Sequence, residues 1–191
     1  MNSKSQKHLY AAAMLILFAA LTRLFPHYPN FTAIGAIAIF GGTMVNDRKL
    51  AFLLPLAALF ISDVCLELFT GVQGFYGKGQ FFVYGAFLLI TWLSTFIRKK
   101  NVLNIGLAAV WSGLIFFILS NFGEWLFSPV NLYPRTFAGL MEGYIAAIPF
   151  YKGEVFGSFF LNTIFGNVFY SALLFGAYYM MTKRSDQKVY A

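Results

Sequence analysis

The sequence predicts an all-α integral membrane protein, a single bundle of about six transmembrane helices with both termini in the cytoplasm. Hydrophobic residues make up 59% of the 191 residues and charged residues only 11%, proportions far from those of soluble domains. The apolar residues lie in runs, and basic residues gather in every second gap between the runs. A chain of this length has room for one transmembrane domain, residues 1–191, and for no soluble catalytic domain.

The distribution of charge predicts the orientation. Because Lys and Arg are retained on the cytoplasmic side, the gaps that hold ten of the fourteen basic residues should face inward. The other four share the outer side with five of the seven acidic residues, so the net charge of +7 does not indicate nucleic-acid binding. The inward set is Lys4, Lys7, Arg48, Lys49, Arg98, Lys99, Lys100, Lys183, Arg184 and Lys188, and the outward basic residues are Arg23, Lys78, Arg135 and Lys152.

The apolar runs are predicted to be helices, because isolated strands cannot satisfy their backbone in lipid. The second run is short and rich in glycine, which favours packing inside the bundle. The pairs Ala38-x-x-x-Gly42 and Ala172-x-x-x-Gly176 favour general helix packing over a specific dimer face. The predicted spans are residues 9–25, 31–46, 50–69, 80–97, 103–122 and 155–181.

Two segments need a separate interpretation. Lys4 and Lys7, followed by an apolar stretch ending near Ala20, resemble a signal peptide, but retention as a first helix is favoured because no soluble mature domain follows.

The connection 123–154 is the longest, and it is predicted to contain a re-entrant or interfacial helix at 136–148. Loops of this length in compact proteins are often functional.

A pair of carboxylates marks the outer end of the third span. Asp63 and Glu67 are four residues apart and share one helical face. Charges within a span need a partner or a wet cavity, and Arg23 is the first candidate partner, with Arg135 as another. Two interpretations of Asp63 stay open: a buried ion pair that joins the first and third helices, or the floor of a substrate cavity. For Glu67, a plain interfacial acid is favoured.

A second polar cluster lies at the outer end of the fifth span. Asn121, Glu124 and Trp125 share a face if the helix continues past residue 122. An amide, a carboxylate and a flat ring together suit a ring-bearing organic ligand, although Trp125 could instead belong to an interfacial aromatic belt. Asn162 and Asn167 in the last span favour interhelical hydrogen bonding over ligand contact.

The sequence predicts no metal site and no cofactor. Cys65 is the single cysteine and is expected to be a small buried hydrophobe facing away from the carboxylate pair. His8 and His27 lie on opposite sides of the membrane and form neither a metal site nor a catalytic dyad. Phosphate-binding loops, nucleophile elbows and zinc motifs are missing from the sequence.

Several short motifs resemble those of a family of small bacterial integral membrane proteins, the DUF6580-like family. This family is in turn distantly similar to the substrate-binding S components of energy-coupling factor vitamin transporters. The motifs are Arg23, Pro29-Asn30-Phe31-Thr32, Gly35-Ala36, Phe40-Gly41-Gly42, Pro55, Ser62-Asp63, Ser120-Asn121, Trp125, Tyr144 and Ile148-Pro149-Phe150.

The resemblance implies a multi-pass protein of the bacterial plasma (inner) membrane that captures a vitamin-like micronutrient outside. It implies release of the substrate after the protein topples against a shared transmembrane and ATPase module. S components offer an Ala-x-x-x-Ala pair on the first helix for docking, and Ala11-Ala12-Ala13 and Ala19-Ala20 here lack that spacing. A solitary transporter of the same fold is therefore the other form of this hypothesis.

We expect a membrane transport protein and not an enzyme. Its partners are the lipid bilayer and a small molecule bound by Arg23, Asn30, Asp63, Asn121, Glu124 and Trp125. Arg23 is expected to clamp an anionic group, Asp63 to accept a hydrogen bond or proton, Asn121 to bind in a bidentate manner and Trp125 to stack. The alternatives are an intramembrane enzyme that uses Asp63 and Glu67 as general acid and base, and a structural subunit of a membrane complex.

Overall fold

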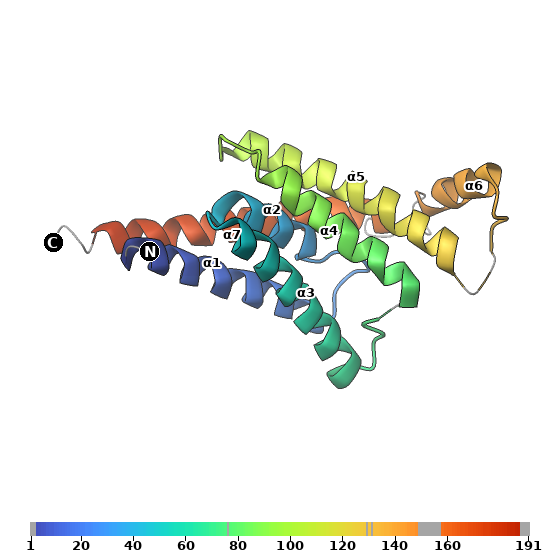
Figure 1. Ribbon diagram of the computed structural model, residues 1–191, viewed down its shortest axis with the longest axis horizontal. Helices are drawn as coiled ribbons and strands as arrows, with labels where there is room; N and C mark the ends of the chain where they lie inside the picture. Colours follow the sequence, from blue (N-terminus) through green and yellow to red (C-terminus); the bar gives the residue numbers. More distant parts are fainter. Residues whose placement is uncertain (1–2, 76, 129, 131, 149–157, 188–191) are drawn as a thin grey trace.

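The computed structural model describes residues 3–75, 77–128, 130, 132–148 and 158–187, and every regular element in these ranges is a helix (Figure 1). This confirms the all-α prediction. The α-helices are α1 (Ser3–Leu21), α2 (Ile34–Met44), α3 (Arg48–Phe69), α4 (Gln80–Ser94), α5 (Val102–Phe127), α6 (Phe137–Ala147) and α7 (Phe159–Gln187). Two short 3-10 helices, η1 (Thr22–Leu24) and η2 (Gly77–Gly79), follow α1 and precede α4.

Side-chain caps explain where three of these helices begin. The Asp47 carboxylate accepts a hydrogen bond from the Leu50 amide at 3.0 Å, Asn101 caps α5 through the Asn104 amide at 2.9 Å, and Thr136 caps α6 through the Gly139 amide at 3.2 Å. Each cap satisfies an amide that the first turn of a helix leaves without a partner. The helix predicted at 136–148 is thus present as α6, while the predicted start of the last span at 155 lies outside the described residues.

Four helices in the described part of the chain are long and apolar enough to cross a membrane, which indicates a membrane protein. These segments are Ser5–Leu24, Arg48–Phe69, Val102–Phe127 and Phe159–Lys183. With 11 residues α2 is about 16 Å long, and with 15 residues α4 is about 22 Å long, both short of a hydrocarbon core of about 30 Å. Both correspond to predicted spans, 31–46 and 80–97, so six complete crossings remain a prediction.

The shortness of α2 reflects its place at the centre of the bundle, where it packs against α1, α3, α4, α5 and α7. Residues Ile34 to Thr43 are all buried. A side chain at Gly35 would overlap the Asn167 amide of α7, one at Gly41 would overlap the Pro55 ring of α3, and one at Gly42 would overlap the Thr91 carbonyl of α4. The glycines therefore let three neighbouring helices approach α2 closely, as its composition predicts.

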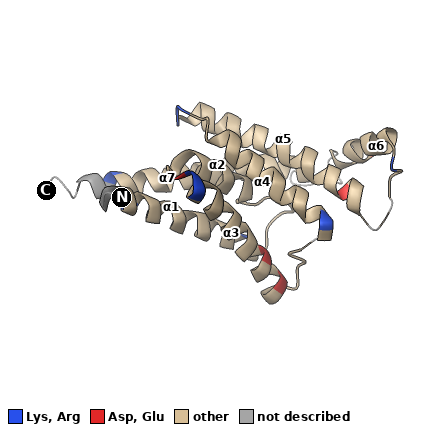
Figure 2. Cartoon of the chain, in the orientation of Figure 1, with Lys and Arg blue, Asp and Glu red and all other residues tan. Residues whose placement is uncertain are grey.

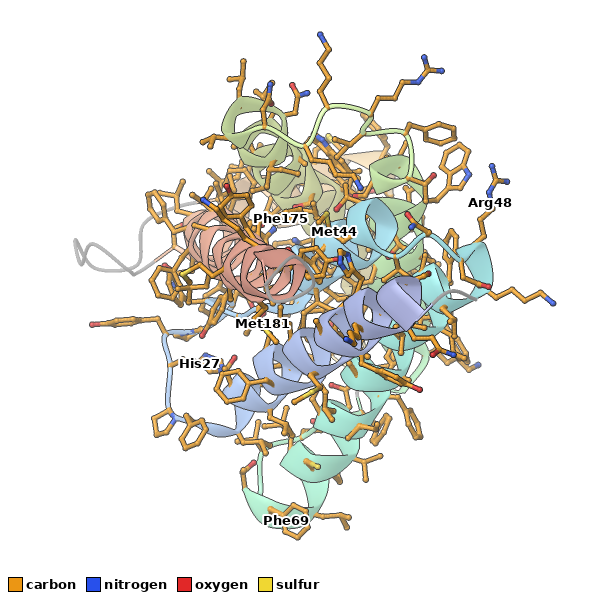
Figure 3. All side chains as sticks on the ribbon, turned by 90° about the vertical axis from the view of Figure 1, so that its left-hand side faces the viewer. His27, Met44, Arg48, Phe69, Phe175 and Met181 are labelled. Atoms are coloured by element: carbon orange, nitrogen blue, oxygen red, sulfur yellow. The ribbon has the colours of Figure 1, made fainter. Side chains whose placement is uncertain are left out.

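Basic residues lie at both ends of the bundle, whereas the acidic residues of the far ends of α3 and α5 lie at one of them (Figure 2). The start of α1 and the α4–α5 connection, which carry basic residues, lie at one end, and Asp63, Glu67 and Glu124 lie toward the far ends of α3 and α5. We call these the basic end and the acidic end. In the view along the bundle from the basic end, Arg48 points outward from its rim (Figure 3). The helices thus place the two sets of gaps on opposite ends, as the charge pattern predicts.

Candidate functional site

A cavity of about 220 Å³ lies at the acidic end among α4, α5, α6 and α7. We call it the acidic-end cavity. Phenylalanine side chains form part of its walls, and polar groups from α5, α7 and the turn before α2 also line it. The aromatic wall residues are Phe116, Phe117, Phe159 and Phe160, and the polar lining residues are Asn30, Ser120, Asn121, Glu124 and Thr163.

Asn30 reaches the cavity from a tight turn. The Phe31 amide donates to the Tyr28 carbonyl at 2.9 Å, and Asn30 has a φ of 60°. Proline followed by a residue with positive φ is the pattern of a type II turn, and Asn tolerates this conformation better than most residues. The buried Asn162 amide of α7 donates to the Pro29 carbonyl at 2.9 Å and so fixes this turn against the bundle.

The polar side chains of α5 differ in whether they already form hydrogen bonds within the protein. The Ser120 hydroxyl donates to the Phe116 carbonyl at 2.6 Å, and the Asn121 amide nitrogen donates to the Phe117 carbonyl at 2.8 Å. Both bonds stay within α5, and the second directs the Asn121 side chain along the helix. Glu124 is exposed at the cavity, and within the described ranges no group donates to its carboxylate. The cavity therefore offers a carboxylate that no described residue neutralises.

Trp125 lies beside this cavity and not on it. It lines a smaller cavity of about 70 Å³, which shares Asn121 and Glu124 with the acidic-end cavity. Its indole nitrogen donates to the Pro134 carbonyl at 3.0 Å, and the Arg135 guanidinium lies 5.9 Å from its ring centroid. The geometry gives Trp125 a structural contact with the α5–α6 connection, so a stacking role toward a ligand remains a prediction.

Arg135 and Tyr144 join the α5–α6 connection to α5. Arg135 donates to the carbonyls of Trp125 and Ser128, the latter at 3.1 Å, and these carbonyls belong to the last turn of α5, which lacks backbone partners. The Tyr144 hydroxyl donates to the Ile118 carbonyl at 2.8 Å. Burial raises the pKa of Tyr144 above its ordinary 10.0 and so further favours the protonated hydroxyl that donates this bond. Arg135 is thus placed beside α5 and not beside Asp63.

Arg23 and Asp63 form a separate buried network. The Arg23 guanidinium lies 2.5 Å from one Asp63 carboxylate oxygen and donates to the Ser62 hydroxyl at 2.6 Å. The other carboxylate oxygen accepts from the Tyr84 hydroxyl at 2.7 Å and from the Gln80 amide at 3.0 Å. Asp63 is 1% exposed, so its charge is compensated entirely by protein groups. The geometry favours the interpretation of Asp63 as part of a buried ion pair. The network around this pair joins the first and third helices and also includes α4.

Glu67 and the loop after α3 extend this network. The Glu67 carboxylate accepts from the Gly74 amide at 2.8 Å, and the Gln80 amide also donates to the Gly74 carbonyl at 3.4 Å. Gly74 packs so closely on the Asp63 backbone that any side chain would overlap it. Glu67 is exposed and Asp63 is buried, so the two carboxylates do not face one shared cavity. This arrangement disfavours their use as a general acid and base pair.

The six residues predicted to bind substrate therefore fall into three places. Asn30, Asn121 and Glu124 line the acidic-end cavity, Trp125 lines the adjacent one, and the pair Arg23 and Asp63 lines neither. Sequence reasoning did not identify Gln80 and Tyr84 of the ion-pair network. Their i, i+4 spacing in an otherwise apolar run would have indicated a polar helical face. The four wall phenylalanines carry no signal among the 24 phenylalanines of the chain.

The remaining candidate residues lie apart from this site. Asn167 is buried and donates to the Ser112 hydroxyl at 2.9 Å, an interhelical bond as expected. Cys65 is partly exposed and forms no disulfide, and the His8 ring lies near the Tyr178 hydroxyl at 3.3 Å. Within the described ranges, no group of three His, Cys, Asp or Glu side chains could hold a metal ion.

Comparison with known proteins identifies the family of the chain. Neither curated proteins nor solved structures gave a match. The model of a family of unknown function, DUF6580, matches residues 3–189, nearly the whole chain. The chain therefore belongs to the DUF6580 family.

Proposed function

We propose that the protein is a membrane transport protein, a substrate-binding subunit or a solitary transporter, that captures a small micronutrient from the outer side. The observation that carries this proposal is the acidic-end cavity, because it combines aromatic walls with polar groups from three separate parts of the chain. Ligand sites usually combine apolar walls with a few placed polar groups in this way.

The size of the cavity limits the ligand to about one ring. An apolar cavity of about 150 Å³ is large enough to bind benzene, and most drug-sized pockets exceed about 300 Å³. At about 220 Å³ the acidic-end cavity lies between these values. A single aromatic or heterocyclic ring with a short substituent fits this volume, and the phenylalanine side chains that line the cavity suit contact with such a ring.

The charge of the cavity favours a ligand with a cationic group. Glu124 brings a negative charge that no described residue neutralises, and the aromatic walls attract cations through their ring faces. The carbonyl oxygen of the Asn121 amide adds an acceptor, since only its nitrogen is used in the bond within α5. A protonated amine attached to the ring would satisfy both groups.

We also propose a transmembrane topology and a cellular location for the protein. Six crossings with the basic end in the cytoplasm of a bacterial cell would place the cavity on the outer face of the plasma membrane, as in S components. The start of α1 and the α4–α5 connection, which carry basic residues, lie at one end of the bundle, and Asp63, Glu67 and Glu124 lie toward the other, which supports this orientation. The partner for inward release would be a shared transmembrane and ATPase module, or none in a solitary transporter.

Three probes that share one ring test the ligand chemistry. Benzylamine, benzyl alcohol and benzoate differ chiefly in charge, and their affinities for the purified protein can be measured by isothermal titration calorimetry. We expect benzylamine to bind most tightly, by about tenfold or more over benzoate, because hydrogen bonds to charged groups contribute about 1.5–3 kcal/mol. In E124Q this preference should disappear.

A matched variant separates this effect from a general change of charge. E142Q makes the same chemical change at an exposed position of α6 that lines neither cavity, and it should keep the preference for benzylamine. Equal or tighter binding of benzoate, or a benzylamine preference that survives in E124Q, would contradict the proposed ligand class.

A further inference from the structure

A second and larger hollow lies at the basic end, between α5 and α7. Its volume is about 630 Å³, and its lining is mainly apolar and includes Met44 of α2. Met44 and Phe175, which both line it, lie in the middle of the bundle in the view from the basic end (Figure 3). We call this hollow the basic-end groove.

Small residues on the two helices create the groove. Gly106 and Ala109 of α5 and Ala172 and Gly176 of α7 line it. A side chain built at Gly106 or at Gly176 would meet no atom within 4 Å among the described residues. Gly176 of the Ala172-x-x-x-Gly176 pair therefore does not pack against another described helix, whereas Gly42 of the other pair does. The groove is a space between two apolar helices that the described residues leave unfilled.

Positive charge and aromatic rings surround the mouth of the groove. Lys100 lines it directly, next to Asn101 at the start of α5. On the other side Tyr179 lines it and is 62% exposed, and the Lys183 ammonium lies 5.7 Å from the centroid of the Tyr179 ring. An apolar groove with cations at its mouth is complementary to a molecule with a long apolar part and an anionic head.

We propose that the basic-end groove binds an anionic phospholipid of the leaflet at the basic end. One acyl chain lies along Gly106 and Gly176, and the phosphate lies between Lys100 and Lys183. Basic pockets between transmembrane helices bind anionic lipid headgroups in this way. This site lies at the opposite end of the bundle from the acidic-end cavity and does not depend on the proposed transport function.

Native mass spectrometry of the full chain, delipidated in detergent, tests this site. Dioleoyl phosphatidylglycerol and dioleoyl phosphatidylcholine are titrated separately, and the bound lipids are counted. We expect phosphatidylglycerol to bind more tightly, and K100Q to lower its affinity about fivefold while leaving that of phosphatidylcholine unchanged. K49Q removes an exposed cation at the same end, outside the groove, and should change neither affinity.

A second variant tests the groove itself. G176L places a side chain in open space within the groove, so the protein should stay folded while the affinities for both lipids fall. An unchanged melting temperature verifies the fold. The proposal is overturned if wild type binds both lipids equally, if G176L binds them as wild type does, or if the spectra show a dimer that G176L dissociates, which would make a second copy the occupant.

Discussion

Replacing Arg23 with methionine is expected to lower the free energy of unfolding by about 3–5 kcal/mol, because it leaves the Asp63 carboxylate buried without its countercharge. Asp63 is 1% exposed, and Arg23 is the cation bound to it, at 2.5 Å. The bonds from Tyr84 and Gln80 supply neutral donors and do not replace a full positive charge. Unfolding by SDS in mixed micelles measures the change.

Two further variants separate a structural role from a ligand-binding role. The double variant R23M/D63L removes both charges and should recover most of the lost stability, since an apolar pair of similar size is often as stable as a buried ion pair. E67Q changes an exposed acid of the same helix, and its effect should stay below about 1 kcal/mol. Full stability of R23M would contradict this account of the network.

Replacing Gly42 with alanine is expected to lower the free energy of unfolding by about 1–3 kcal/mol, through overpacking between α2 and α4. The new methyl group would overlap the Thr91 carbonyl, and it would lie 2.8 Å from the Ser94 Cβ atom. Both obstacles are rigid, because one is backbone and the other is the first atom of a buried side chain. The same SDS titration measures the loss.

The matched control for Gly42 is a glycine of α4, the helix that Gly42 contacts. A side chain at Gly85 of α4 would meet nothing within 4 Å, so G85A should be neutral or stabilising by up to about 1 kcal/mol through helix propensity. A loss in G85A equal to that in G42A would show that the glycines act through local helix properties and not through the contact between α2 and α4.

The helices could be predicted from the sequence because the relevant signals are local. Apolar runs and capping residues such as Asp47 and Asn101 locate each helix to within a few residues. The basic gaps between the runs indicate which helix ends lie at the same end of the bundle. The helix predicted at 136–148 is present as α6, and the Thr136 cap marks its start. The lengths of α2 and α4 were overestimated, because an apolar run does not show where a helix ends. After α2 the chain becomes extended at Val45, and after α4 it continues as hydrogen-bonded turns through Ile97.

Which residues lie at the site depends on contacts between segments far apart in the chain, and a single sequence does not reveal these contacts. Arg23 and Asp63 were predicted as partners because a charge within a span needs one, but nothing local shows that Tyr84 and Gln80 complete their network. Glu124 has the same residue type as Glu67, and only the fold places one at a cavity and the other against a loop amide.

Labelling of a single cysteine tests most directly whether the acidic-end cavity is an outward-facing binding site. In a Cys65→Ser background, S120C carries a thiol on the cavity wall and K100C carries one at the basic end. We expect a membrane-impermeant maleimide to label S120C in spheroplasts, more slowly with benzylamine present, and to label K100C only after permeabilisation. Labelling of S120C only after permeabilisation, or at a rate that benzylamine does not change, would contradict the account.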